Sequence, residues 1–141
     1  MIEMSDEQIT EEFLNLGDKD KSVIIYIYEI NKNIKPGDIA KRLQLPHSTI
    51  NSVIKRLVSK KLVNWKEYAY VELTTQANKM AAHHLKHHII IHHYFEHELD
   101  LSNQDAHEEG LRIAGVISCP TVIRMKAKIP DCELSPCKVY M

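Results

Sequence analysis

The stretch Pro36–Leu73, PGDIAKRLQLPHSTINSVIKRLVSKKLVNWKEYAYVEL, decides the fold of this chain. A short helix is predicted over Pro36–Leu43, because proline suits the first turn of a helix. Pro46 disfavours helical geometry at the residue before it, so a turn follows at once. A second helix is predicted over residues 47–61, because its apolar residues recur at spacings of three and four. These residues are Ile50, Val53, Ile54, Leu57 and Val58.

Together with further predicted elements, these two helices follow a known order of secondary-structure elements. The spacing of apolar residues predicts an amphipathic helix over residues 19–33, ahead of the stretch. Two β-prone runs at residues 62–65 and 68–73 flank Lys66 and Glu67 and predict a hairpin. Helix, helix, turn, helix and β-hairpin is the order of a winged helix-turn-helix, which is a DNA-binding fold.

The rest of the chain is predicted to be helical. Helices are expected over residues 76–99, 104–118 and 121–129, and the tail from Pro130 onward is expected to be irregular. The predicted fold class is mainly α with a small β-hairpin. We expect an N-terminal winged helix-turn-helix domain over residues 1–75, of which residues 1–18 form an acidic extension. A helical domain with a cysteine-containing tail is expected over residues 76–141.

Charge is balanced over the whole chain but segregated along it. The 141 residues carry a formal net charge of −1, whereas residues 1–20 carry −6 and residues 35–67 carry +6. The overall balance gives no general attraction to nucleic acid, but the basic segment coincides with the predicted winged helix. The start of the chain has no apolar targeting segment, and no long apolar run follows. We therefore expect a cytoplasmic protein without membrane contact.

The predicted 47–61 helix has the composition of a DNA recognition helix. Such a helix lays its first turns in the major groove, where short polar side chains contact base edges and cations contact phosphates. The expected DNA-binding residues are His47, Ser48, Thr49, Asn51, Ser52, Lys55, Arg56 and Lys66. For any one of these residues, a merely solvated polar face is the alternative.

Two groups of sequence segments resemble the sequence pattern of one protein family. The first group lies in the winged helix and comprises Asp38–Leu43, Ser48–Ile50, Lys55–Leu57, Lys61–Val63, Tyr68 and Leu73–Thr74. The second comprises Lys86–His88, Glu98–Leu101 and Ala106–Ser118. Together they resemble the diphtheria-toxin-repressor (DtxR) family of metal-dependent transcriptional regulators over about residues 20–118. The resemblance implies a short two-domain form without the SH3-like domain. It also implies a homodimer whose helical domain dimerises and binds metal, and which binds a near-palindromic operator.

Histidine is the outlier of the composition, with nine residues. His84, His88 and His92 share one face of the predicted helix, because residues four apart point the same way. Two imidazoles one turn apart chelate a divalent transition metal such as Fe, Zn, Mn, Co or Ni when a third ligand arrives from elsewhere. The family resemblance implies a site at His88, His92 and His107, in which His92 replaces an acid. Three imidazoles favour Zn or Fe over Mn.

Other histidines and the three cysteines carry weaker signals. His83, His84, His87, His93 and His97 are expected to have no ligand role, and a structural role is the alternative for the three residues of the site. A second metal site of the family has no counterpart, because its positions are occupied by Leu111, Ala114 and Gly115. Cys119, Cys132 and Cys137 are candidate iron–sulfur or zinc ligands, with idle thiols as the alternative.

These features predict a metal-responsive transcriptional repressor of metal-homeostasis genes that binds double-stranded DNA as a homodimer. One alternative is a winged-helix regulator that senses a small molecule without metal, as in the MarR-type architecture, or that senses redox state through an iron–sulfur cluster. Another is a metal-storage protein that uses the histidine cluster. An enzyme is not expected, because no nucleophile–base–acid set or phosphate loop appears.

Overall fold

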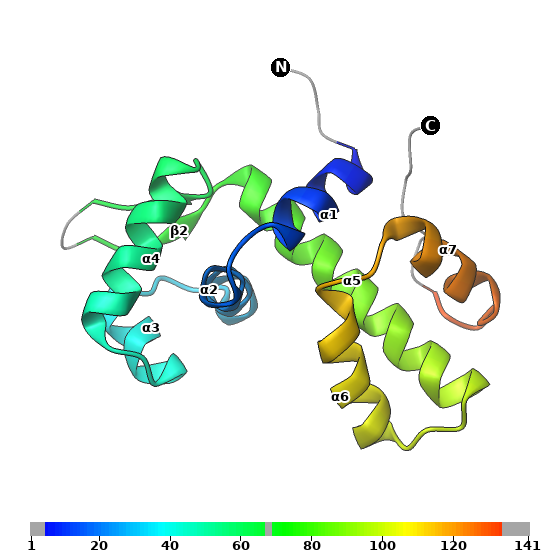
Figure 1. Cartoon of the computed structure of the whole chain (residues 1–141). Coiled ribbons are helices and arrows are strands. Elements are labelled where there is room, and N and C mark those ends of the chain that lie inside the picture. The colour runs from blue at the N-terminus through cyan, green and yellow to red at the C-terminus, as the bar shows by residue number, and fades with distance from the viewer. Residues whose placement is uncertain (1–4, 67–68, 134–141) are drawn as a thin grey trace. The chain divides into compact units, whose positions relative to one another are not determined.

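The computed structural model describes residues 5–66 and 69–133 of the chain (Figure 1). Within these residues lie α1 (Asp6–Leu14), α2 (Asp18–Ile30), α3 (Pro36–Leu43), α4 (His47–Ser59), β1 (Val63–Asn64), β2 (Glu72–Leu73), α5 (Thr75–Glu98), α6 (Asn103–Ala114) and α7 (Cys119–Ala127). The predicted fold class, mainly α with one small hairpin, is confirmed. No helix among the described residues combines the length and the apolar character needed to cross a lipid bilayer.

The helix-turn-helix is built from α3 and α4 packed on α2. Pro36 occupies the first turn of α3, and Gln44 ends that helix in the left-handed region, with φ of 55°. This left-handed residue reverses the chain within the predicted turn and lets α4 begin at His47. Four of the five residues of the predicted apolar stripe of α4, Ile50, Val53, Ile54 and Leu57, are fully buried, as their spacing predicts. Val58, the last residue of the predicted stripe, is 37% exposed.

The wing is a short antiparallel hairpin. Val63 pairs with Leu73, and Asn64 pairs with Glu72. An isolated bridge between Ile34 and Val71 extends this pairing toward the loop before α3, and the Val71 amide donates to the Ile34 carbonyl at 2.8 Å. The strands are shorter than the predicted runs, and residues 67–68 at the predicted hairpin tip lie outside the described residues.

The acidic start of the chain contains a helix, α1, that the sequence analysis does not predict. Its N-terminus is a capping box: Ser5 Oγ accepts from the Gln8 amide at 3.1 Å, and Gln8 Oε1 accepts from the Ser5 amide at 2.9 Å. Ile9 and Phe13, four residues apart, are buried. The Ser-x-x-Gln pattern followed by this apolar pair is the signal that would have predicted α1.

The contacts divide the described chain into two compact units. Residues 5–15 and 82–133 form one unit, and residues 16–81 form the other. From the sequence, the whole N-terminus is instead expected to belong to the winged helix-turn-helix domain, with a boundary after residue 75. The difference arises because α1 contacts α7 and buries Ile9 and Phe13, an apolar pair that net charge does not reveal.

In the unit of residues 5–15 and 82–133, α5, α6 and α7 pack through two kinds of contact. Ile90 of α5 forms an apolar cluster with residues in and after α7, namely Cys119, Val122, Ile129 and Cys132. On α6 the buried residues are all small: Ala106, Gly110 and Ala114. Small residues at four-residue spacing let two helix backbones approach closely. The prediction that α6 extends to residue 118 is wrong, because Gly115 ends it and α7 begins at Cys119.

Substitution of Phe13 tests whether α1 is an integral part of the fold. Phe13→Ala removes a side chain that is 3% exposed, and we expect it to lower the free energy of unfolding by about 3 kcal/mol. Val116→Ala, at a side chain 74% exposed, is the control and should change the free energy by less than about 0.5 kcal/mol. Urea titration of both variants measures the difference. Equal midpoints would contradict a packed α1.

Candidate functional sites

The start of α4 presents most of the expected DNA-binding side chains to solvent. His47, Ser48, Asn51, Ser52 and Lys55 are exposed, and Thr49 is half-buried. Ser52 Oγ donates to the Ser48 carbonyl at 3.0 Å, as serine commonly does within a helix. Lys66, next to the wing tip, is also exposed. The exposed side of α4 near its start is therefore polar, and Lys55 and Lys66 are exposed cations of the winged helix.

Arg56 differs from the other expected phosphate contacts, because it pairs with a carboxylate of the protein. Its Nη2 atom lies 2.8 Å from Asp20 Oδ1, and its Nε atom donates to Asp20 Oδ2 at 3.4 Å. The hydrogen bond to Asp20 and the negative charge of that carboxylate raise the pKa of Arg56 above its ordinary value. The Asp20 carboxylate is almost fully buried, whereas Arg56 is half-exposed. Arg56 thus joins α4 to α2.

The structure brings the three histidines of the predicted metal site together. The donor atoms of His88, His92 and His107 all lie within 4.8 Å of one another. The ring centroids of His88 and His107 are 5.0 Å apart, and those of His92 and His107 are 5.9 Å apart. His88 and His92 come from successive turns of α5, and His107 comes from the first half of α6.

A glycine makes the close approach of α6 to His88 possible. A Cβ atom at Gly110 would lie 2.8 Å from Cδ2 and 3.3 Å from Nε2 of His88. Real Cβ atoms do not approach a ring carbon so closely, so any other residue at this position would push the imidazole aside. Gly110 therefore shapes the cradle of the His88 ring, although the sequence analysis does not single it out.

Two further polar residues adjoin the cluster. Glu96 Oε1 contacts His92 Nε2 and accepts a hydrogen bond from Asn103 Nδ2 at 2.9 Å. Ser102 caps α6 by accepting from the Asp105 amide at 3.1 Å, and this cap fixes the start of the helix that carries Asn103. A carboxylate that orients an imidazole is a common partner of metal-ligating histidines. The four-residue spacing of His92 and Glu96 is the signal that would have found this contact.

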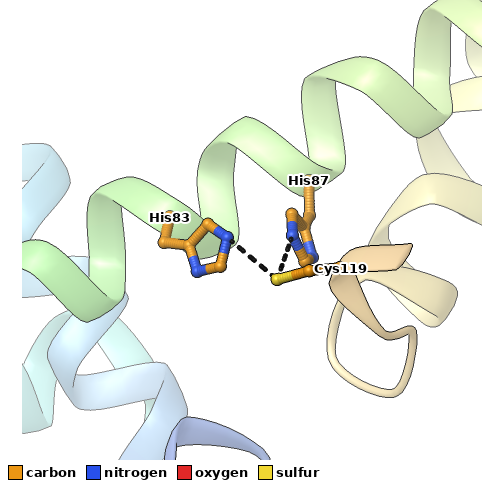
Figure 2. Close-up of side chains that lie close together, drawn as sticks. All are labelled: His83, His87 and Cys119. Atoms are coloured by element: carbon orange, nitrogen blue, oxygen red, sulfur yellow. Dashed lines mark hydrogen bonds between the residues drawn. The ribbon is translucent and has the colours of Figure 1, made fainter. Parts of the chain in front are cut away.

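A second cluster, His83, His87 and Cys119, was not predicted. Figure 2 shows both imidazoles projecting from successive turns of α5 toward the sulfur at the start of α7. Cys119 Sγ lies 3.4 Å from His83 Nε2 and 3.6 Å from His87 Nε2. All three side chains are buried, and the expectation that His83 and His87 have no ligand role stays a prediction.

The other two cysteines stand apart from this cluster. Cys132 is buried in the apolar cluster around Ile90 and belongs to neither group of donor atoms found among the described residues. Cys137 lies outside the described residues. The structure therefore brings Cys119 together with histidines, and the expectation of an iron–sulfur or zinc site that uses Cys119, Cys132 and Cys137 stays a prediction.

Several solved structures share the fold of this chain, and metal-dependent repressors are among them. ScaR with bound Zn²⁺ matches with a TM-score of 0.70 and 22% identity, over 81% of this chain and 54% of that one. A manganese-dependent transcriptional repressor in complex with manganese matches with a TM-score of 0.69 and 19% identity, over 83% and 55%. The hypothetical protein SSo2273 from Sulfolobus solfataricus matches with a TM-score of 0.71 and 21% identity, over 86% and 95%.

The chain therefore has a DtxR-like fold, as the sequence resemblance predicts. It spans about half the length of the matched repressors ScaR and the manganese-dependent repressor, and nearly the whole length of SSo2273. No protein-family model matches the sequence, and no curated protein matches it.

Substitution of Arg56 separates its structural contact from its positive charge. Arg56→Gln leaves the buried Asp20 carboxylate without its guanidinium, and we expect the free energy of unfolding to fall by about 1 kcal/mol. Lys55→Gln removes the same charge from the neighbouring exposed position and should leave stability within about 0.5 kcal/mol of the parent. Urea unfolding measures both variants. If both variants have the stability of the parent, the pair with Asp20 contributes nothing.

Proposed function

We propose that this chain is a metal-dependent transcriptional regulator of the DtxR family that binds operator DNA as a homodimer. One observation carries the proposal: three imidazoles from α5 and α6 meet at the predicted position in a chain with the fold of metal-dependent repressors. The solved neighbours include repressors described as manganese-dependent, manganese-activated or bound to Zn²⁺ or Cd²⁺.

The residues of the cluster fit a divalent transition metal. Imidazole nitrogen suits Zn, Fe, Co and Ni, and the ring of His88 is held in a cradle that Gly110 keeps open. His88, His92 and His107 would hold the ion, and the contact of Glu96 with His92 would orient that ring. When bound, the ion supplies a positive charge and fixed directions of coordination, and no chemical reaction is required of it. Imidazoles without a carboxylate among the three ligands favour Zn or Fe over Mn.

The winged helix would supply the DNA contacts. The exposed start of α4 would enter the major groove with His47, Ser48, Asn51 and Ser52, and Lys55 and Lys66 would contact phosphates. Thr49 and Arg56 would contribute less to DNA binding, because Thr49 is half-buried and Arg56 is paired with Asp20. A two-fold dimer would bind a near-palindromic operator with its half-sites about one helical turn apart.

Metal would control DNA binding by favouring one conformation. An ion held by α5 and α6 stabilises the arrangement of these helices in which all three imidazoles reach it. A ligand shifts an equilibrium only through its different affinity for the two states, and coupling of this kind is typically about 1–3 kcal/mol. Operator affinity should therefore rise about 5- to 150-fold when the site is filled.

Operator selection followed by titration tests the proposal. The untagged protein selects duplexes from a random pool with Zn²⁺ present, and fluorescence anisotropy then measures affinity with Zn²⁺ or with chelator. We expect a near-palindromic duplex that the parent binds about 5- to 150-fold more tightly with metal. His107→Gln should abolish that increase and leave the weak metal-free affinity unchanged, because His107 is exposed and far from the winged helix in sequence.

His97→Gln is the matched control, since His97 is exposed on α5 and belongs to neither donor cluster among the described residues. It should keep the full response of operator affinity to metal.

Tight operator binding that chelator does not change would favour a metal-independent regulator of MarR type. Several ions per chain with no selected duplex would favour metal storage. Either result would overturn the proposed function.

The glycine that faces His88 offers a second, more local test. Gly110→Ala places a methyl group against the His88 ring and should weaken Zn²⁺ binding at this site by about 10- to 100-fold, the range typical of residues that orient a ligand. Gly115→Ala is the control, because a Cβ atom there meets nothing within 4 Å. Competition with a fluorescent chelator measures both. Equal affinities would show that His88 does not depend on this cradle.

A further inference from the structure

The cluster of His83, His87 and Cys119 has the composition and the burial of a metal site separate from the one above. His83 is 6% exposed, and His87 and Cys119 are each 1% exposed. We propose that it binds a second ion of the zinc class, Zn²⁺ or Co²⁺, through two imidazoles and one thiolate. The inference goes beyond the proposed regulator, because it does not depend on DNA binding or on His88, His92 and His107.

The distances between the donor atoms are those of a tetrahedral metal site. With Zn–S of about 2.3 Å and Zn–N of about 2.0–2.1 Å, a sulfur and a nitrogen on one ion lie roughly 3.6 Å apart. Cys119 Sγ lies 3.4 Å from His83 Nε2 and 3.6 Å from His87 Nε2 (Figure 2). Both sulfur–nitrogen distances therefore match those expected on one ion, and the three atoms would supply three corners of the tetrahedron.

The hydrogen-bonding capacity of the cluster also favours an ion. A thiol carries one proton, yet several polar atoms lie near Cys119 Sγ, among them the Nε2 atoms of both histidines and the Thr10 hydroxyl oxygen at 3.3 Å. The thiol can donate to only one of these neighbours, and sulfur is a weak acceptor for the others. A thiolate bound to an ion, with lone pairs of both Nε2 atoms on the same ion, satisfies all three ligands at once.

Thr10 of α1 is placed to orient the first ligand. Its hydroxyl oxygen lies 2.8 Å from Nδ1 of His83, the ring nitrogen that does not face the sulfur. When Nδ1–H donates to this oxygen, the Nε2 atom of His83 carries the lone pair and faces Cys119 Sγ. Thr10 is thus a positioning residue. The ion would join α5 to α7 through its ligands, and the contact of Thr10 with His83 would add α1.

The donor set distinguishes this site from the three-histidine site. A thiolate is softer than an imidazole and favours Zn²⁺ and Co²⁺ over Mn²⁺. The two sites also differ in burial: His107 is exposed, whereas every ligand of the second site is buried. We expect the buried site to exchange its metal more slowly, and to act as a structural site of the unit formed by residues 5–15 and 82–133.

Cobalt titration of the untagged, reduced full chain tests the inference, because only a thiolate ligand gives a sulfur-to-cobalt charge-transfer band in the near ultraviolet. The parent should show this band. His107→Gln should keep it, with saturation at one Co²⁺ per chain, since that variant alters only the three-histidine site. Cys119→Ser should lose it, and His87→Gln should bind Co²⁺ at least about tenfold more weakly. Cys132→Ser, at the other buried cysteine of the described residues, should retain it.

Thr10→Val tests the positioning role. It should keep the charge-transfer band and lower Co²⁺ affinity by about 10- to 100-fold, because sulfur remains a ligand while His83 loses its partner. A variant that kept both the band and the affinity of the parent would show that Thr10 positions nothing. Circular dichroism of each metal-free variant confirms that the helices are intact.

A cysteine variant that misfolds would lose the cobalt band whether or not Cys119 is a ligand. A second measurement therefore uses His107→Gln, which keeps every ligand of the second site. X-ray absorption of Zn²⁺-loaded His107→Gln should show a sulfur neighbour at about 2.3 Å with nitrogen neighbours at about 2.0–2.1 Å. Zinc should also raise the melting temperature of this variant. Two results would overturn the proposal: no sulfur neighbour of the metal in the folded protein, or a cobalt band that persists in Cys119→Ser. The cluster would then serve only to form hydrogen bonds. None of these measurements depends on DNA binding. A negative result for the second metal site is therefore distinguishable from a negative result for the proposed function.

Discussion

The helical period of α5 determines how the histidines of this protein are used. Residues four apart lie on one face of a helix, whereas adjacent residues point about 100° apart. The pairs His83/His87 and His88/His92 are each spaced by four but are offset from each other by five residues, so they approach different neighbours. The first pair meets Cys119 at the start of α7, and the second meets His107 of α6. One run of histidines thus contributes to two donor clusters with different chemistry.

The offset also assigns different environments to the two clusters. The face that carries His83 and His87 includes Met80 and Ile90, all buried, so its imidazoles are held by core packing. The face that carries His88 and His92 borders α6, whose small buried residues let the helices approach while His107 stays exposed. In the proposed regulator the signal ion would have to bind and dissociate, and an exposed ligand suits that exchange. A buried set with a thiolate suits an ion that stays with the fold.

The sequence predicts those features that depend on residues close together in the chain. The apolar spacing of Ile50, Val53, Ile54 and Leu57 predicts α4, and the family resemblance predicts the meeting of His88, His92 and His107. Contacts between distant segments could not be predicted in this way. Asp20 and Arg56 are 36 residues apart, and His87 and Cys119 are 32 apart. Nothing local marks these as partners, because one contact depends on how α2 packs on α4 and the other on how α5 packs on α7. The helix α1 was within reach of prediction through its capping box, which the acidic composition obscured.

The place of α1 in the fold has a consequence for biosynthesis. Thr10 contacts His83 and Cys119 across 73 and 109 residues of sequence, so α1 leaves the ribosome long before its partners do. The winged helix between them lies within one continuous stretch, residues 16–81, and can fold before α7 is made. Until α5 and α7 are made, Ile9 and Phe13 have no core to enter and are open to chaperones or to non-native contacts. The acidic residues that surround this apolar pair in the sequence would keep the nascent segment soluble during that interval.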